Sequence, residues 1–194
     1  MANPSESPAL LNPGAKTPLA SARDFLSDVE TLRARARRQI DAGAVTGDYG
    51  IDPALAARVL NAALATEIVC VLRYRHHHFV ARGLNSEPIA QEFLTHSNEE
   101  LGHADRIAQR IVQLGGTPQL DPAGLTGRSH AEYLTPPGLT DMIRENLVAE
   151  RIAIESYREM IAFFGERDPT TRSMLEAILA VEEQHADELS DLLA

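Results

Sequence analysis

SNEELGHAD, residues 97–105, contains the pattern Glu100-x-x-His103, on which the fold prediction rests. The pattern returns near the other end of the chain, where VEEQH, residues 181–185, contains Glu182-x-x-His185. On a helix, residues three apart lie on one face, about one turn from each other. Each segment can therefore direct a carboxylate and an imidazole at one point. A single such pattern is a weak signal. The prediction therefore depends on where the two copies lie in the fold and on which residues of other helices face them.

Four long helices surround these patterns. They are expected from Asp52-Pro53 to about Arg82, from about Glu87 to Leu114, from Thr140 or Asp141 to about Phe164, and from Asp168-Pro169 to Ala194. The polar segment between Gly115 and Gly138 is long for a connection inside a compact domain. A short link joins the first helix to the second, and another joins the third to the fourth, whereas the long segment joins the two pairs. This order predicts an all-α, antiparallel four-helix bundle, with the long link crossing along its length.

An N-terminal extension, residues 1–51, is predicted to precede the bundle of residues 52–194. Residues 1 to about 20 contain four prolines and no hydrophobic period, which indicates a flexible tail. A short amphipathic helix is expected to follow from Ala22 to about Asp41, with Ser21 as its N-cap.

Composition limits the class of protein. With 194 residues and 44% hydrophobic residues, the chain can bury the core of one domain. The only cysteine, Cys70, excludes an internal disulfide and a four-cysteine metal site, and is expected to be a small buried apolar residue. The net charge of −10 makes nucleic acid an unlikely partner. Neither a signal peptide nor a stretch of some 18 apolar residues is recognised, so a cytoplasmic protein without a membrane span is expected.

Each predicted inner helix face is apolar except near its middle. The exceptions are Glu67 on the first helix, Glu100 and His103 on the second, Glu150 on the third, and Glu182 and His185 on the fourth. Counted from the short turn of each helical pair, the four glutamates lie about 15–18 residues away, or roughly 22–27 Å along the helix axes. We therefore expect them to meet at one level in the middle of the bundle.

Four ionised carboxylates at one buried point would repel each other, and each one buried alone would cost several kcal/mol. Two divalent cations would balance the four negative charges, with two shared carboxylates and with one terminal carboxylate and one imidazole for each ion. Oxygen-rich ligation with some imidazole favours iron or manganese. Tyr74, two turns after Glu67, either packs in the core or reaches this centre. Glu99, Glu183 and His96 are expected to face solvent or a neighbour, with an accessory iron site at His96 left open.

Residues 53–194 resemble the ferritin-like superfamily, and within it the bacterioferritin and Dps-like di-iron branch. ELGHADRI, residues 100–107, followed by GGTP at 115–118, is similar to the second helix of bacterioferritins, and residues 181–185 are similar to their fourth. The resemblance implies that one iron is held by Glu67, Glu100 and His103 and the other by Glu150, Glu182 and His185, with Glu100 and Glu182 bridging. It also matches Tyr74 to a tyrosine near that site.

Two departures from the bacterioferritin pattern change the expectation. Leu101 stands where bacterioferritins have the methionine that ligates haem, so no haem is predicted. Only nine residues follow His185, too few for the fifth helix of 24-subunit cages, so a Dps-like dodecameric shell or a dimer is expected.

The leading functional hypothesis is a ferroxidase that oxidises Fe(II) to Fe(III) with O2 or H2O2 at a di-iron centre, for iron storage or detoxification. One alternative uses the same ligands in a di-iron or di-manganese peroxidase, catalase or oxygenase that stores no mineral. A second alternative is a non-enzymatic helical scaffold that binds partners through the N-terminal extension.

Overall fold

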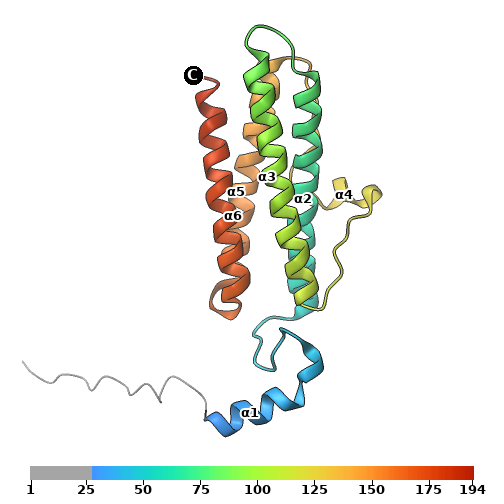
Figure 1. Ribbon diagram of the computed structural model, residues 1–194, viewed down its shortest axis with the longest axis vertical. Helices are drawn as coiled ribbons and strands as arrows, with labels where there is room; N and C mark the ends of the chain where they lie inside the picture. The colour runs from blue at the N-terminus through green and yellow to red at the C-terminus, as the bar shows by residue number, and fades with distance from the viewer. Residues whose placement is uncertain (1–27) are drawn as a thin grey trace, which may run out of the picture. The chain divides into compact units, whose positions relative to one another are not determined.

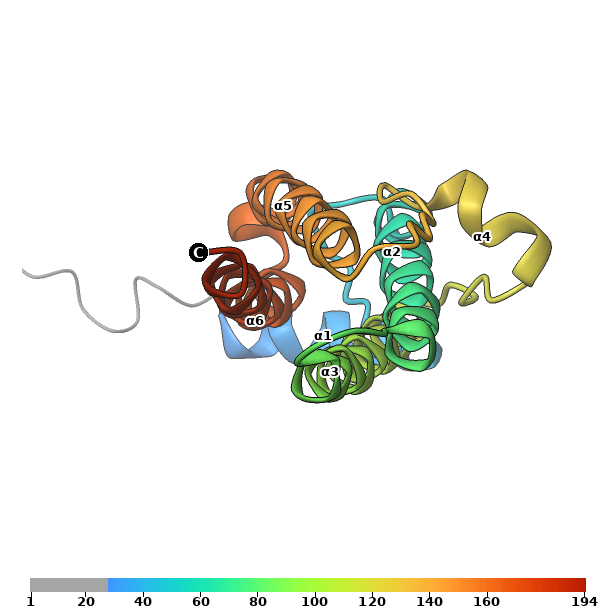
Figure 2. The same ribbon diagram turned by 90° about the horizontal axis from the view of Figure 1, so that it is seen from above.

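The computed structural model describes residues 28–194, which contain six α-helices, two short 3-10 helices and no β-strand. The bundle is formed by the four long helices, α2 (Pro53–Val80), α3 (Ser86–Gln113), α5 (Leu139–Phe164) and α6 (Pro169–Asp191). These agree with the predicted helices to within three residues at each end. Figures 1 and 2 show α2 packed beside α3, and α5 beside α6, so the all-α four-helix bundle is confirmed.

Residues ahead of the bundle are divided between two compact units, of which one ends at Arg38 and the other comprises Gln39–Ala194. The predicted N-terminal helix is represented by α1 (Val29–Arg38), which buries none of its residues and is followed by a 3-10 helix at Ile40–Ala42. The predicted tail and the predicted start of that helix, including Ser21 and Ala22, lie outside the described residues.

Aspartate followed by proline starts both α2 and α6. The carboxylate of Asp52 accepts a hydrogen bond of 2.9 Å from the backbone N–H of Ala54, and Asp168 accepts one of 2.9 Å from that of Thr171. Proline at the first helical position loses nothing, because its missing N–H would have no partner inside the helix. Asp121-Pro122 starts the seven-residue helix α4 (Pro122–Arg128) in the same way, which sequence analysis did not predict.

The long connection between α3 and α5 runs along α2, as predicted, and carries α4 beside α2 outside the bundle (Figures 1 and 2). Successive residues of this connection form hydrogen bonds with successive residues of α2. The pairs are Asn61 with Thr117 and Gln119, Thr66 with His130, Arg73 with Glu132, and His77 with Leu134. The crossover therefore returns the chain to the end of the bundle at which α5 must start.

Helix α2 is apolar enough and long enough to cross a membrane, with a mean hydropathy of 1.8 over its most apolar 18 residues. Within the bundle, 67% of that stretch is buried. The helix is enclosed by α3, by α5 and by the crossover, which is the arrangement of a core helix in a globular bundle.

Two apolar clusters fill the interior. One contains Leu60, Leu64, Ile107, Leu175 and Ile178, and the other contains Cys70, Phe93, Met142, Ile143 and Leu189. On α2 and on α6, the glutamate of the predicted centre lies in sequence between the residues of the two clusters. The bundle is therefore apolar, then polar, then apolar along its axis. The buried, unpaired Cys70 is confirmed as part of the apolar packing.

Candidate metal centre

All six side chains of the predicted centre are brought together in the polar layer of the bundle. The six residues are between 0% and 3% exposed, and they come from all four long helices. Burial of four carboxyl groups in one layer would be very unfavourable without positive charge or protons to compensate it. The geometry of the layer shows how this compensation is arranged.

The first group of donor atoms surrounds the imidazole of His103. Its Nδ1 atom lies 2.8 Å from Glu182 Oε1, 3.2 Å from Glu100 Oε2 and 3.4 Å from Glu67 Oε2. These four side chains offer one donor atom each within 4.8 Å of one another, close enough to hold one cation.

The second group surrounds the imidazole of His185. Its Nδ1 atom lies 3.6 Å from both Glu100 Oε1 and Glu182 Oε2, and 3.9 Å from Glu150 Oε1. These four side chains also bring one donor atom each within 4.8 Å of one another. Glu100 and Glu182 belong to both groups and present a different oxygen to each histidine. Two carboxylates placed between two donor groups are in position to bridge two ions.

Several buried atoms in this layer make no hydrogen bond. They are Glu67 Oε2, both carboxylate oxygens of Glu182, and His185 Nδ1, although Glu182 Oε1 has the 2.8 Å ion-pair contact with His103. Buried polar atoms in folded proteins nearly always have a partner, and a metal ion can serve as that partner when no hydrogen bond does. A donor set of four carboxylates and two imidazoles without thiolate fits iron or manganese.

Without a bound cation, protons must balance the charge. Burial, followed by the charge of Glu100, raises the pKa of Glu67 to about 8, and burial and the same charge raise the pKa of Glu150 well above its ordinary value. Burial and the charge of Glu182 would raise the pKa of Glu100, but the adjacent imidazoles of His103 and His185 lower it overall. The terminal glutamates therefore tend to be protonated while Glu100 stays ionised.

The two histidines show the complementary effect. Burial would lower the pKa of each, but their carboxylate neighbours outweigh it and raise the pKa of His103 to about 12 and that of His185 to about 11. Both imidazoles are thus positively charged near neutral pH. Protons on these histidines and on the terminal glutamates take the place that two divalent cations would fill.

Two tyrosines reach the centre. Tyr74 donates a hydrogen bond to Glu150, as the second of the two predicted possibilities allows, and Tyr157 donates one to Glu67. Tyr157 is not among the residues predicted for this centre. A repeated spacing could have indicated it, because each tyrosine lies seven residues after the glutamate of its own helix.

Of the two predicted possibilities for His96, solvent or a neighbour, the structure has the second. Its side chain is fully buried, and its ring stacks on that of His185 with 4.0 Å between centroids. Its Nδ1 atom lies 3.3 Å from the Tyr74 hydroxyl and its Nε2 atom 3.0 Å from Glu188 Oε2. The packing of α6 against α3 covers this part of α3 and removes His96 from solvent.

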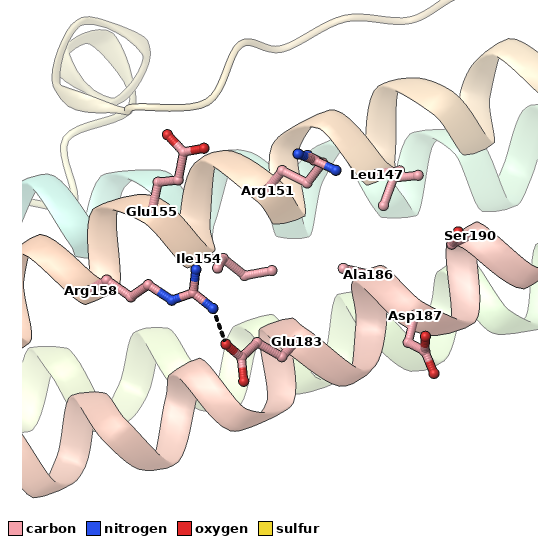
Figure 3. A pocket seen from close by; sticks show the side chains of 9 residues that line it. All are labelled: Leu147, Arg151, Ile154, Glu155, Arg158, Glu183, Ala186, Asp187 and Ser190. Atoms are coloured by element: carbon pink, nitrogen blue, oxygen red, sulfur yellow. Dashed lines mark hydrogen bonds and ion pairs between the residues drawn. The ribbon is translucent and has the colours of Figure 1, made fainter.

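Glu99 and Glu183 are exposed, as predicted, yet Glu99 also contacts the centre. Its side chain is 48% exposed, and its carboxylate accepts a 2.8 Å hydrogen bond from His185 Nε2. Glu183 instead points into a groove of about 400 Å³ on the outside of α5 and α6, where it pairs with Arg158 at 2.6 Å (Figure 3). Of these two glutamates, only Glu99 contacts a histidine of the centre.

Comparison with known proteins gives a consistent result. A family model described as a ferritin-like domain matches residues 57–194. Bacterioferritin from Rhodobacter capsulatus is 30% identical over 132 residues, which cover 66% of this chain and 76% of that protein. A nutrient stress-induced DNA-binding protein from Nostoc is 30% identical over 140 residues, which cover 70% of this chain and 75% of that protein.

A solved structure is similar over the same region. The bacterioferritin-related protein from Bacteroides fragilis, described as a dodecameric thioferritin, has a TM-score of 0.71 and 34% sequence identity. The match covers 74% of this chain and 86% of that one.

Proposed function

This chain belongs to the ferritin-like domain family, and we propose that its buried centre is a ferroxidase site that oxidises Fe(II) to Fe(III). The observation that carries the proposal is the position of Glu100 and Glu182, each of which presents one oxygen to His103 and the other to His185. A buried pair of shared carboxylates suits two like ions held side by side, because each ion receives the same number of ligands.

In this proposal two Fe(II) ions bind as substrates. Glu67 and His103 are the terminal ligands of one, Glu150 and His185 those of the other, and Glu100 and Glu182 bridge the two. Each Fe(II) gives up one electron. O2 would take the two electrons and two protons to become H2O2, whereas H2O2 would take two electrons and two protons to become two molecules of water. Carboxylates suit both oxidation states because hard oxygen ligands bind Fe(III) as well as Fe(II).

Tyr74 and Tyr157 act in this proposal as positioning residues for the terminal glutamates. Tyr157 donates to Glu67 Oε1, which leaves Oε2 directed at His103. Tyr74 donates to Glu150 Oε1, the oxygen that also faces His185. The Tyr74 hydroxyl also lies 3.3 Å from His96 Nδ1.

Iron storage requires an enclosed volume, which a single bundle lacks. We propose a homo-oligomeric shell in the cytoplasm, and the dodecameric description of the Bacteroides fragilis protein supports twelve subunits for it. The Fe(III) produced at the centre would then be deposited inside that shell.

The test is Fe(II) oxidation by a Glu100→Gln, Glu182→Gln double variant, followed by the absorbance of the ferric product after addition of O2 or H2O2. Glutamine keeps the size of each side chain but removes the charge and one ligand oxygen. We expect the rate to fall by more than the ~10–100-fold that the loss of an outer hydrogen-bond partner to a metal ligand costs.

Glu183→Gln is the matched control, because Glu183 follows Glu182 in sequence but faces the outer groove. It should oxidise Fe(II) at the parent rate. Oxidation at the parent rate by the double variant, with unchanged helix content, would reject the site.

A further inference from the structure

Three side chains outside the six-residue centre meet between α3 and α6. Glu92 and His96 lie one turn apart on α3, and Glu188 lies opposite on α6, one turn after His185. The Nε2 atom of His96 is 3.0 Å from Glu188 Oε2 and 3.4 Å from Glu92 Oε1. One donor atom from each side chain lies within 4.8 Å of the others, which makes this a third group able to hold a cation.

The spacing of these atoms already fits a bound metal ion. Bonds of about 2.0–2.2 Å from a divalent ion to imidazole nitrogen and carboxylate oxygen place neighbouring ligand atoms about 3.0–3.5 Å apart. The distances from His96 Nε2 to Glu188 Oε2 and to Glu92 Oε1 fall in this range. The three donor atoms all lie within 4.8 Å of one another.

The burial of His96 distinguishes this group from exposed acidic residues alone. Its ring is fully buried, and its Nε2 atom points at the carboxylates of Glu92 and Glu188. A deprotonated ring nitrogen is a ligand for a divalent ion, which would replace the contact between His96 and Glu188.

The carboxylates of this group can be reached from outside the bundle. The side chains of Glu92 and Glu188 are 38% and 37% exposed, and both line a surface hollow of about 530 Å³ that also contains Asp191. Gln184 donates a 2.8 Å hydrogen bond to Glu188 Oε1, which leaves Oε2 directed at His96. A hydrated cation could therefore exchange water for these ligands at the bundle surface.

We propose that Glu92, His96 and Glu188 form a third binding site for a divalent metal ion, separate from the six-residue centre and open to the hollow between α3 and α6. The ring of His96 lies between this site and the centre, because its face stacks on His185 while its Nε2 atom points at Glu92 and Glu188. Binding of the ion does not depend on the proposed ferroxidase function. A role in supplying Fe(II) to the centre would rest on that function.

The test is the number of Zn(II) ions bound per chain, measured on the full-length protein by equilibrium dialysis and elemental analysis. Zinc is a useful probe because it binds the same ligand types without redox chemistry. A Glu92→Gln, Glu188→Gln double variant should bind one ion fewer than the parent. Because both side chains are partly exposed, this variant should keep the parent's unfolding temperature, and Glu183→Gln should keep its full count of ions.

The Glu100→Gln, Glu182→Gln variant separates this proposal from the proposed function. It should lose the ions of the centre and retain the ion of the third site, which His96→Gln should also remove. If the centre binds no metal in the parent, the Glu92→Gln, Glu188→Gln variant should still bind one ion fewer than the parent. An equal count of Zn(II) in the parent and in the Glu92→Gln, Glu188→Gln variant would overturn the third site.

Discussion

Tyr74 on α2 donates a hydrogen bond to Glu150 on α5, and Tyr157 on α5 donates one to Glu67 on α2. Each tyrosine therefore contacts the glutamate of the other helix. Each tyrosine lies two helical turns after the glutamate of its own helix. The two helical pairs therefore contribute equivalent sets of side chains, each with one glutamate, one tyrosine and one Glu-x-x-His pattern. This equivalence gives the centre two similar halves.

Replacement of either tyrosine by phenylalanine should destabilise the protein. The change leaves a buried carboxyl oxygen without its partner, which costs about 1–3 kcal/mol. Thermal unfolding of Tyr74→Phe and Tyr157→Phe should therefore occur below the parent temperature. Tyr133→Phe is the control, because Tyr133 is 43% exposed. Equal unfolding temperatures for all three variants would show that the two buried hydroxyls do not stabilise the centre.

The stability of the metal-free protein should fall as the pH rises. The pKa of Glu67 is raised to about 8 in the folded state, so folding retains a proton that the unfolded chain loses near its ordinary pKa. This proton's contribution to the free energy of unfolding is complete at low pH and is lost as the pH rises to about 8. The raised pKa values of His103 and His185 act in the same direction at higher pH. Urea unfolding of metal-free protein between about pH 5 and about pH 9 would measure this. A flat profile would contradict it.

Binding of metal at the centre should release protons. Glu67, Glu150, His103 and His185 all have raised pKa values, and metal ligands bind in their deprotonated forms. Two divalent cations should displace about four protons near neutral pH. Calorimetry of Zn(II) binding in buffers of different ionisation enthalpy gives the number released. The Glu100→Gln, Glu182→Gln variant should release far fewer protons. Equal release from the variant and the parent would show that the protons do not come from the residues of the centre.

Glu99→Gln should weaken metal binding although Glu99 is exposed. Its carboxylate accepts the hydrogen bond from His185 Nε2 at 2.8 Å, which orients the ring and increases the basicity of Nδ1. Loss of such a partner typically costs ~10–100-fold in metal affinity or activity. The rate of Fe(II) oxidation at low Fe(II) concentration would show the effect, with Glu183→Gln as the control. Equal rates for the two variants would exclude a role for Glu99.

Light scattering of the native protein tests the proposed shell. Twelve chains of 21.2 kDa would have a mass of about 254 kDa. A monomer could not enclose a mineral. Fe(II) oxidation by a monomer would instead favour the peroxidase, catalase or oxygenase alternative, in which iron stays in the centre.

The sequence by itself determined the four long helices and the level at which their glutamates meet. Aspartate–proline starts, glycine ends and the helical period are local signals, and the constant rise of a helix converts residue counts into heights. The same Asp-Pro signal precedes α4 at Asp121, but seven residues are too few to show a hydrophobic period. The grouping of Glu67, Glu100, Glu150 and Glu182 could thus be predicted from spacing alone.

Only the tertiary structure decided what surrounds that group. His96 is buried because α6 brings His185 and Glu188 against it, a contact between residues about 90 positions apart in sequence. The hydrogen bond from His185 to Glu99 likewise depends on the rotation of α6 relative to α3. Helical periodicity assigns a face within one helix, but it contains no information about which side chains of another helix will face it.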